Sequence, residues 1–221
     1  MTDRLHHEVS QTSHRMRPPS SRSGSLKVTA LALLVFLGGC ARAKPVHYYQ
    51  ISYASSSLGS GDALDVTLLV RNLMASHLYR EDRIVFGSSS EQMGTYTNER
   101  WAEAPTDMLQ NALIRGLRAG GRFRSVMPLR SDFQGDFIIT GHLYDFKEME
   151  ANGVQARLNF DLEMRDAKSR KLVWTHSYNH DEPASGKGIT AVAAAMDKNV
   201  QRSVQEVQGS LEEYFRSHAA K

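Results

Sequence analysis

The sequence predicts an α+β fold in which a mainly antiparallel sheet, polar on one face, carries two amphipathic helices packed on the other face. Residues 154–165 alternate strictly between apolar and polar side chains, which indicates a strand buried on one side. Apolar residues recur every three or four positions over 101–117 and over 188–215, which indicates two helices with one apolar face each. Asn152-Gly153 precedes the alternating strand and is typical of a tight hairpin turn.

The first half of the fold is expected to combine short strands with the first helix. The expected strands cover residues 47–53, 65–71, 83–86, 94–97 and 122–127. Pro105 is tolerated only within the first turn of a helix, so the regular helix is expected to begin near it. Gly120-Gly121 is expected to end this helix, because glycine readily adopts the positive φ found at helix termini.

The second half is expected to be a three-strand meander followed by a long helix. The meander comprises residues 137–147, 154–165 and 172–178, with turns at 152–153 and 166–170. The helix begins at about Gly188, and its apolar residues keep one face to the end of the pattern. The opposite face carries Lys, Asn, Gln, Arg, Ser and Glu, as expected for a helix that covers a sheet.

Cys40 is the only cysteine in the chain, and its surroundings predict lipid attachment. Lys27 is followed by an apolar run of about ten residues and then by Leu-Gly-Gly-Cys, the layout of a secretory signal that ends in small residues. The string looks like a bacterial lipobox, in which the signal is cut before the cysteine and the sulfur is acylated. The alternative is an uncleaved membrane anchor, but residues 28–37 span only about 15 Å as a helix, half of a hydrocarbon core.

The expected domain organisation follows from this cleavage site. Residues 1–39 form a lipoprotein signal peptide, with Met16 as an alternative start to Met1. Residues 40–63 contain the lipidated cysteine, a short tether, the first strand and a Ser/Gly linker. Residues 64–221 form a single α+β domain. The body is expected to be held to a membrane by lipid alone.

The charge distribution argues against a nucleic-acid partner. The net charge of +3 belongs to the signal peptide, which carries 5 Lys+Arg and 2 Asp+Glu. The remaining residues carry 22 of each kind, so they offer no excess of positive charge to neutralise phosphates. The mature part has no second cysteine, so an intrachain disulfide is excluded.

No motif of the chain predicts catalysis. His176 and His180 would lie roughly 13 Å apart on the expected strand, too far to share a metal ion, and are expected to be solvated. Asp181-Glu182 is interpreted as a turn, and 186–188 as a helix start, because the rest of a phosphate loop is missing. We expect no catalytic residue, no cofactor beyond covalent lipid and no metal, although catalytic groups that converge from distant segments stay open.

Several strings together resemble the ABC-type transport auxiliary lipoprotein family. They are Tyr48-Tyr49, Leu78–Arg80, Tyr96, Arg100–Glu103, Leu117, Gly121–Val126, Gly141–Glu148 and Leu172–Trp174. The most specific of them is Arg-Trp-Ala-Glu at the entrance of the first helix.

The resemblance implies a non-enzymatic subunit. It would work beside an inner-membrane ABC permease and ATPase and a periplasmic protein with a mammalian-cell-entry domain, moving lipids or other hydrophobic cargo between membranes. Ala41 after Cys40, rather than aspartate, is the pattern associated with the outer membrane, so the lipid-anchored body would face the periplasm.

Tyr96, Arg100 and Trp101 are the candidate contacts with that partner, because aromatic and arginine side chains are efficient interface anchors. A structural alternative exists for two of them: Trp101 could seal the core, and Arg100 could pair with Glu103.

A second function fits the same layout. A tethered envelope-assembly or scaffold lipoprotein would bind another envelope protein through an exposed sheet face or edge strand. Direct lipid binding and homo-oligomer formation are left open by the sequence.

Overall fold

The computed structural model describes residues 44–52, 63–89, 92–130, 132–150 and 153–218. The chain divides into two compact units, residues 1–44 and 45–221, and the elements below belong to the second unit. The predicted signal peptide, Cys40 and Asn152 lie outside the described residues.

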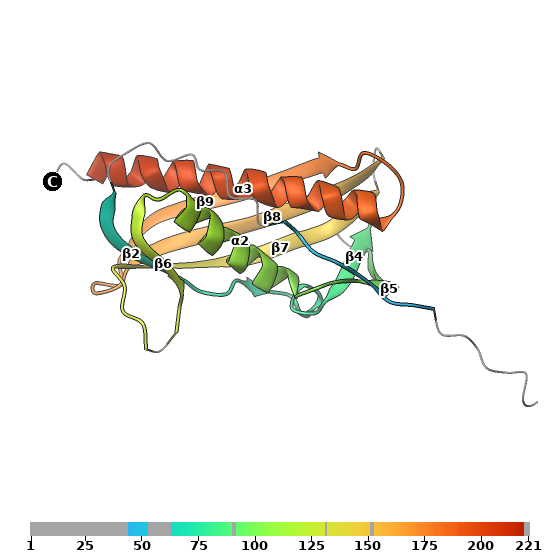
Figure 1. The fold of residues 1–221 in the computed structure, drawn as a ribbon, viewed down its shortest axis with the longest axis horizontal. Coiled ribbons are helices and arrows are strands. Elements are labelled where there is room, and N and C mark those ends of the chain that lie inside the picture. The colour runs from blue at the N-terminus through green and yellow to red at the C-terminus, as the bar shows by residue number, and fades with distance from the viewer. Residues whose placement is uncertain (1–43, 53–62, 90–91, 131, 151–152, 219–221) are drawn as a thin grey trace, which may run out of the picture. The chain divides into compact units, whose positions relative to one another are not determined.

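The described residues form one large sheet with two α-helices (Figure 1). The strands are β1 (His47–Tyr49), β2 (Leu64–Val70), β3 (Met74–Ala75), β4 (Arg83–Gly87), β5 (Met93–Trp101), β6 (Phe123–Pro128), β7 (Phe137–Glu150), β8 (Val154–Asp166) and β9 (Leu172–Pro183). The α-helices are α2 (Pro105–Ala119) and α3 (Ile189–His218), and η1 (His77–Tyr79) is a 3₁₀ turn.

The sheet is mixed, so the expectation of a mainly antiparallel sheet is wrong. Among the described strands, β7 pairs antiparallel with β8 on one side, and on the other side it pairs parallel with β2, β3 and β4 in succession. The pairs β2–β6 and β1–β5 are also parallel, whereas β4–β5 and β8–β9 are antiparallel. The parallel pairs join strands that are far apart in the sequence, and alternation within a strand indicates its buried face but not its partner.

The predicted meander is confirmed as β7, β8 and β9, although β9 is longer than expected. It extends to Pro183, so Asp181 and Glu182 lie in the strand rather than in a turn. The positive φ of Gly153, 99°, fits the expected tight turn between β7 and β8.

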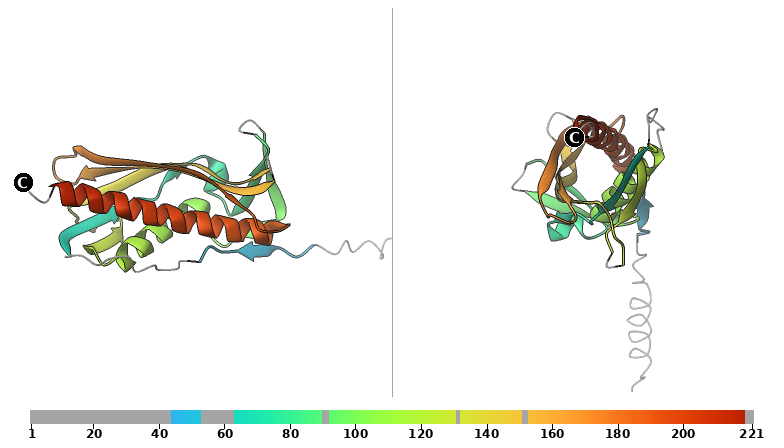
Figure 2. Two further views of the ribbon diagram at one scale, coloured as in Figure 1. Left: turned by 90° about the horizontal axis from the view of Figure 1, so that it is seen from above. Right: turned by 90° about the vertical axis from the view of Figure 1, so that its left-hand side faces the viewer.

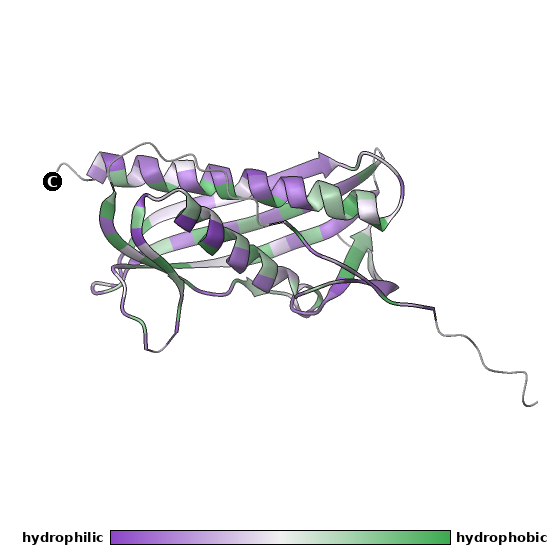
Figure 3. Ribbon diagram, viewed as in Figure 1, coloured by the Kyte–Doolittle hydropathy of each residue, from purple (hydrophilic) through white to green (hydrophobic). Residues whose placement is uncertain are grey.

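The core lies between the sheet and the two helices, which pack against each other (Figure 2). Helix α3 packs on β8 and β9, and α2 packs on β6. Alternate residues of β8 face α3 and are fully buried, among them Leu158, Phe160 and Leu162. The predicted apolar face of α3 is buried along the helix, whereas polar residues occupy much of its outer face (Figure 3).

Helix α2 begins and ends where the sequence predicts. Pro105 occupies its first turn, and Gly120 is its C-cap. Gly121 follows with φ of 64°, the left-handed conformation that glycine adopts without steric cost. Gly116 faces α3, and a Cβ atom there would overlap Cγ1 of Val204, so the two helices approach closely at this glycine.

None of the helices in the described ranges combines the length and the apolar character needed to cross a bilayer.

Candidate functional site

A groove of about 530 Å³ lies where the β4–β5 hairpin meets the end of β7. We call it the hairpin groove. It is lined by Phe86, Gly87, Ser88, Gln92, Met93, Gly94, Tyr96, Glu148 and Glu150. Its volume is within the range of small-ligand and side-chain pockets.

The floor of the hairpin groove is aromatic. Antiparallel pairing places Phe86 opposite Gly94, and a Cβ atom on Gly94 would lie 2.6 Å from Cζ of Phe86. The missing side chain therefore lets the Phe86 ring lie across β5, where it meets the Tyr96 ring with centroids 4.7 Å apart at 51°. Phe86 keeps 37% of its surface exposed, so the groove offers apolar contact area.

The wall of the hairpin groove is acidic. Glu148 and Glu150 are two residues apart on β7 and project from the same face. The Tyr96 hydroxyl donates a hydrogen bond to Oε2 of Glu148 at 2.9 Å. Burial, this hydrogen bond and the negative charges of Glu148, Glu150 and Glu99 raise the pKa of Tyr96. Among the described residues, the lining includes these two carboxylates and no Lys, Arg or His.

A buried ion pair lies behind Met93. The Met93 sulfur is 3.9 Å from Nζ of Lys147 and 3.8 Å from the Tyr79 hydroxyl. Lys147 is buried, and its ammonium contacts Oδ1 of Asp145 at 2.7 Å. The charge of Lys147 is therefore matched within the fold, on the face of β7 opposite to Glu148 and Glu150, and the groove keeps an acidic character.

The structure separates the three predicted contact residues, all of which belong to β5. Tyr96 lines the hairpin groove. The Arg100 guanidinium donates to Oδ1 of Asp82 at 2.6 Å, so the alternative pairing with Glu103 is not formed. Trp101 is only 1% exposed, and its ring packs edge-on against Phe146 with centroids 5.3 Å apart. The side chain of Trp101 thus seals the core, and it offers no surface to a partner in this fold.

Of the nine described residues that line the groove, the sequence analysis singled out Tyr96 and missed the other eight, among them Phe86, Glu148 and Glu150. The alternating pattern of β5 and the glycine at position 94 were the available signals for the hairpin pair. The approach of Glu148 had no local signal, because it depends on the parallel pairing of Phe86 with Glu148 between β4 and β7.

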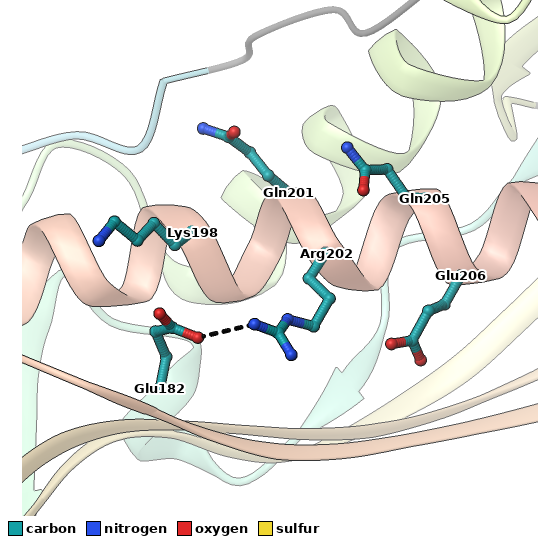
Figure 4. A pocket seen from close by; sticks show the side chains of 6 residues that line it. All are labelled: Glu182, Lys198, Gln201, Arg202, Gln205 and Glu206. Atoms are coloured by element: carbon teal, nitrogen blue, oxygen red, sulfur yellow. Dashed lines mark hydrogen bonds and ion pairs between the residues drawn. The ribbon is translucent and has the colours of Figure 1, made fainter. Parts of the chain in front are cut away.

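A second hollow, of about 680 Å³, lies between α3 and the end of β9 (Figure 4). Lys198, Gln201, Arg202, Gln205 and Glu206 project from α3, and Glu182 projects from β9. Arg202 donates to Oε2 of Glu182 at 3.1 Å, so charges of both signs meet inside the hollow. This internal pairing makes it a weaker candidate for a charged partner than the hairpin groove.

His176 is half-buried rather than solvated as expected. Its ring stacks parallel to Trp174, with centroids 5.7 Å apart, and burial lowers its pKa while the Glu206 charge acts in the opposite direction. Within the described part of the chain, no three His, Cys, Asp or Glu side chains gather as metal ligands do.

Comparisons with known proteins found one matching family model and solved structures with a similar fold. The family model described as ABC-type transport auxiliary lipoprotein component matches residues 49–208. No curated protein matches the chain. The crystal structure of XCC0632 from Xanthomonas campestris, of the family model DUF330, superposes with a TM-score of 0.71 at 17% identity, covering 79% of this chain and 100% of that chain. The crystal structure of an uncharacterized protein superposes with a TM-score of 0.59 at 15% identity, covering 76% and 99%.

Proposed function

Because the chain belongs to the family of ABC-type transport auxiliary lipoprotein components, we propose that it is a non-catalytic subunit of a transport system of the mammalian-cell-entry class. In this role it helps to move lipids or other hydrophobic cargo between the two membranes. The observation that carries the proposal is the extent of the family match, which runs from β1 into α3 and so includes nearly the whole folded unit.

The anchor in this proposal is Cys40. A lipid on its sulfur would hold the folded unit at the outer membrane, facing the periplasm. The tether from Ala41 to Pro45 reaches at most about 20 Å when extended, so the body would stay near the bilayer. No cofactor other than the covalent lipid is required, since ATP hydrolysis belongs to the ATPase of the system.

The hairpin groove is the proposed docking surface for the periplasmic mammalian-cell-entry protein. Its exposed Phe86 and its half-buried Tyr96 supply rigid apolar contact area of the kind that dominates interface energetics. Arg100 lies on the same strand, but its ion pair with Asp82 assigns it to the support of the hairpin rather than to the docking surface.

Two measurements test this function. Palmitate labelling of the chain, with Cys40→Ser as the control, is expected to give a labelled band that the variant lacks. Affinity purification of the full chain from envelope extracts is expected to recover the mammalian-cell-entry protein, the permease and the ATPase. Purification that recovers none of the three would refute the transport role, whatever the labelling gives.

A second candidate is an envelope-assembly or scaffold lipoprotein, and strand β9 favours it. Among the described strands, β9 pairs only with β8, so backbone groups that are not bonded to β8 could pair with an incoming chain; the His180 carbonyl already accepts a hydrogen bond from Asn199. This function predicts cross-links from β9 to outer-membrane assembly proteins and none to a transporter.

A further inference from the structure

We propose that the hairpin groove binds an arginine side chain that the docking protein presents. The inference rests on the proposed function and adds the chemistry of the contact. It is carried by three observations: two aromatic rings at an angle, two carboxylates beside them, and no cationic side chain among the lining residues that the structure describes.

The aromatic floor suits a flat cation. Phe86 and Tyr96 form a corner with ring centroids 4.7 Å apart at 51°, and Phe86 is held over Gly94. The guanidinium group of arginine is planar and weakly hydrated, and it stacks on aromatic faces.

The acidic wall requires hydrogen-bond donors from the ligand. Glu148 and Glu150 present carboxylate oxygens at the edge of the aromatic floor, and the Tyr96 hydroxyl holds Glu148 beside the ring. Guanidinium has five N–H donors in a fork that matches carboxylate geometry. The trimethylammonium group of choline has none, and it would leave the carboxylates beside it without a donor as water is displaced.

The distribution of charge around the hairpin groove also favours a cationic ligand. The buried cation Lys147 is matched by Asp145 at 2.7 Å, and Glu99 adds to the negative charge that acts on Tyr96. An arriving cation would therefore meet a negative field that the lining does not compensate. Charge complementarity selects a basic partner over an acidic or purely apolar one.

Titration of the full chain in detergent micelles with N-acetyl-arginine-N-methylamide tests the proposal. The readout is the ring resonances of Tyr96 in protein labelled with ¹³C at tyrosine, assigned by their loss in Tyr96→Phe. We expect a saturable shift with the arginine probe. Choline is expected to bind at least about tenfold more weakly, because its cationic group offers the carboxylates no N–H donor.

Two variants and a matched control give the test its specificity. Glu148→Gln/Glu150→Gln keeps the shape of the groove and a hydrogen-bond acceptor for Tyr96, and it is expected to weaken the arginine probe about tenfold or more. Phe86→Leu is expected to weaken it about three- to tenfold by removing one stacking face. Glu213→Gln is the control: this exposed residue of α3 pairs with Arg216, three residues along the same helix, and its substitution is expected to change nothing.

The outcomes separate the two proposals. If the wild-type chain recovers the transport proteins and Glu148→Gln/Glu150→Gln recovers them equally well, the function stands and the arginine contact is refuted.

Other outcomes would give the groove a different ligand. Choline binding as tight as the arginine probe would make the groove a lipid-headgroup site and would also refute the arginine contact. Self-association that disappears in the double variant would assign the groove to a second copy of the chain and would likewise refute the arginine contact with the docking protein. If the probe binds the groove but no transport protein is recovered, the transport function fails while the guanidinium site stands.

Discussion

At the scale of the residue, Trp101 links the end of β5 to the centre of the sheet. Its ring packs against Phe146 and is almost wholly enclosed. We predict that Trp101→Ala lowers the free energy of unfolding by about 3–5 kcal/mol, the usual cost of removing a buried aromatic side chain. Urea denaturation measures this loss.

The matched control for this change is Tyr48→Ala. Tyr48 is 64% exposed, and its removal is expected to change stability by no more than about 0.5 kcal/mol. A Trp101→Ala variant with unchanged stability and weaker partner recovery would instead support the contact role that the sequence suggested.

His176 makes stability depend on pH. Burial lowers its pKa in the folded state below that of the unfolded chain, so the fold favours the neutral ring. The stability from this group is complete above the unfolded pKa of about 6.5, and it is lost as the pH falls from there toward the folded pKa. We predict a smaller loss of stability between pH 7 and pH 5 in His176→Gln than in the wild type.

Urea titrations at both pH values measure this difference. His77→Gln is the control, because His77 is exposed, and it is expected to keep the wild-type pH dependence. An unchanged pH dependence in His176→Gln would show that the ring titrates alike in the folded and unfolded states.

Asp181 also makes stability fall as the pH falls, but at lower pH. The hydrogen bond from Arg157 lowers the pKa of Asp181 in the folded state, so the stability that this carboxylate contributes is lost only in the acid range.

At the scale of the element, the contact between α2 and α3 depends on Gly116. A methyl group there would overlap Cγ1 of Val204, which is stiff because valine is branched at Cβ. Alanine favours the helix by about 1 kcal/mol over glycine, but overpacking costs about 1–3 kcal/mol. We predict that Gly116→Ala is destabilising overall in thermal or urea unfolding.

A double variant tests the mechanism of this prediction. Gly116→Ala/Val204→Ala provides the space that the new methyl group needs, so its loss of stability is expected to be smaller than the sum of the two single losses. Strict additivity would mean that the helices shift to accommodate the methyl group without touching Val204.

At the scale of the whole molecule, residues 45–221 form a compact unit with its own core. The short strand β1 belongs to this unit, because it pairs with β5 and Tyr49 packs against the core. We predict that a chain beginning at Pro45 keeps the far-UV circular dichroism and the urea midpoint of the longer chain. A broad, non-cooperative transition would contradict an independent fold.

The sequence by itself determined the local elements of this protein. Helix α2 was predicted from its Pro105 start and Gly120 end, α3 from its apolar spacing, and β8 from its alternation, because each signal lies within the element. Tyr96 was identified through the family resemblance and does line the groove.

Only the tertiary structure decided how the strands are ordered and what the groove contains. The parallel pairing of β4 with β7 places Glu148 beside Phe86, although these residues are far apart in the sequence. The same long-range packing buries Trp101, so its side chain offers no surface to a partner. Strand pairing depends on which distant surfaces fit together, and no periodicity within a strand encodes that choice.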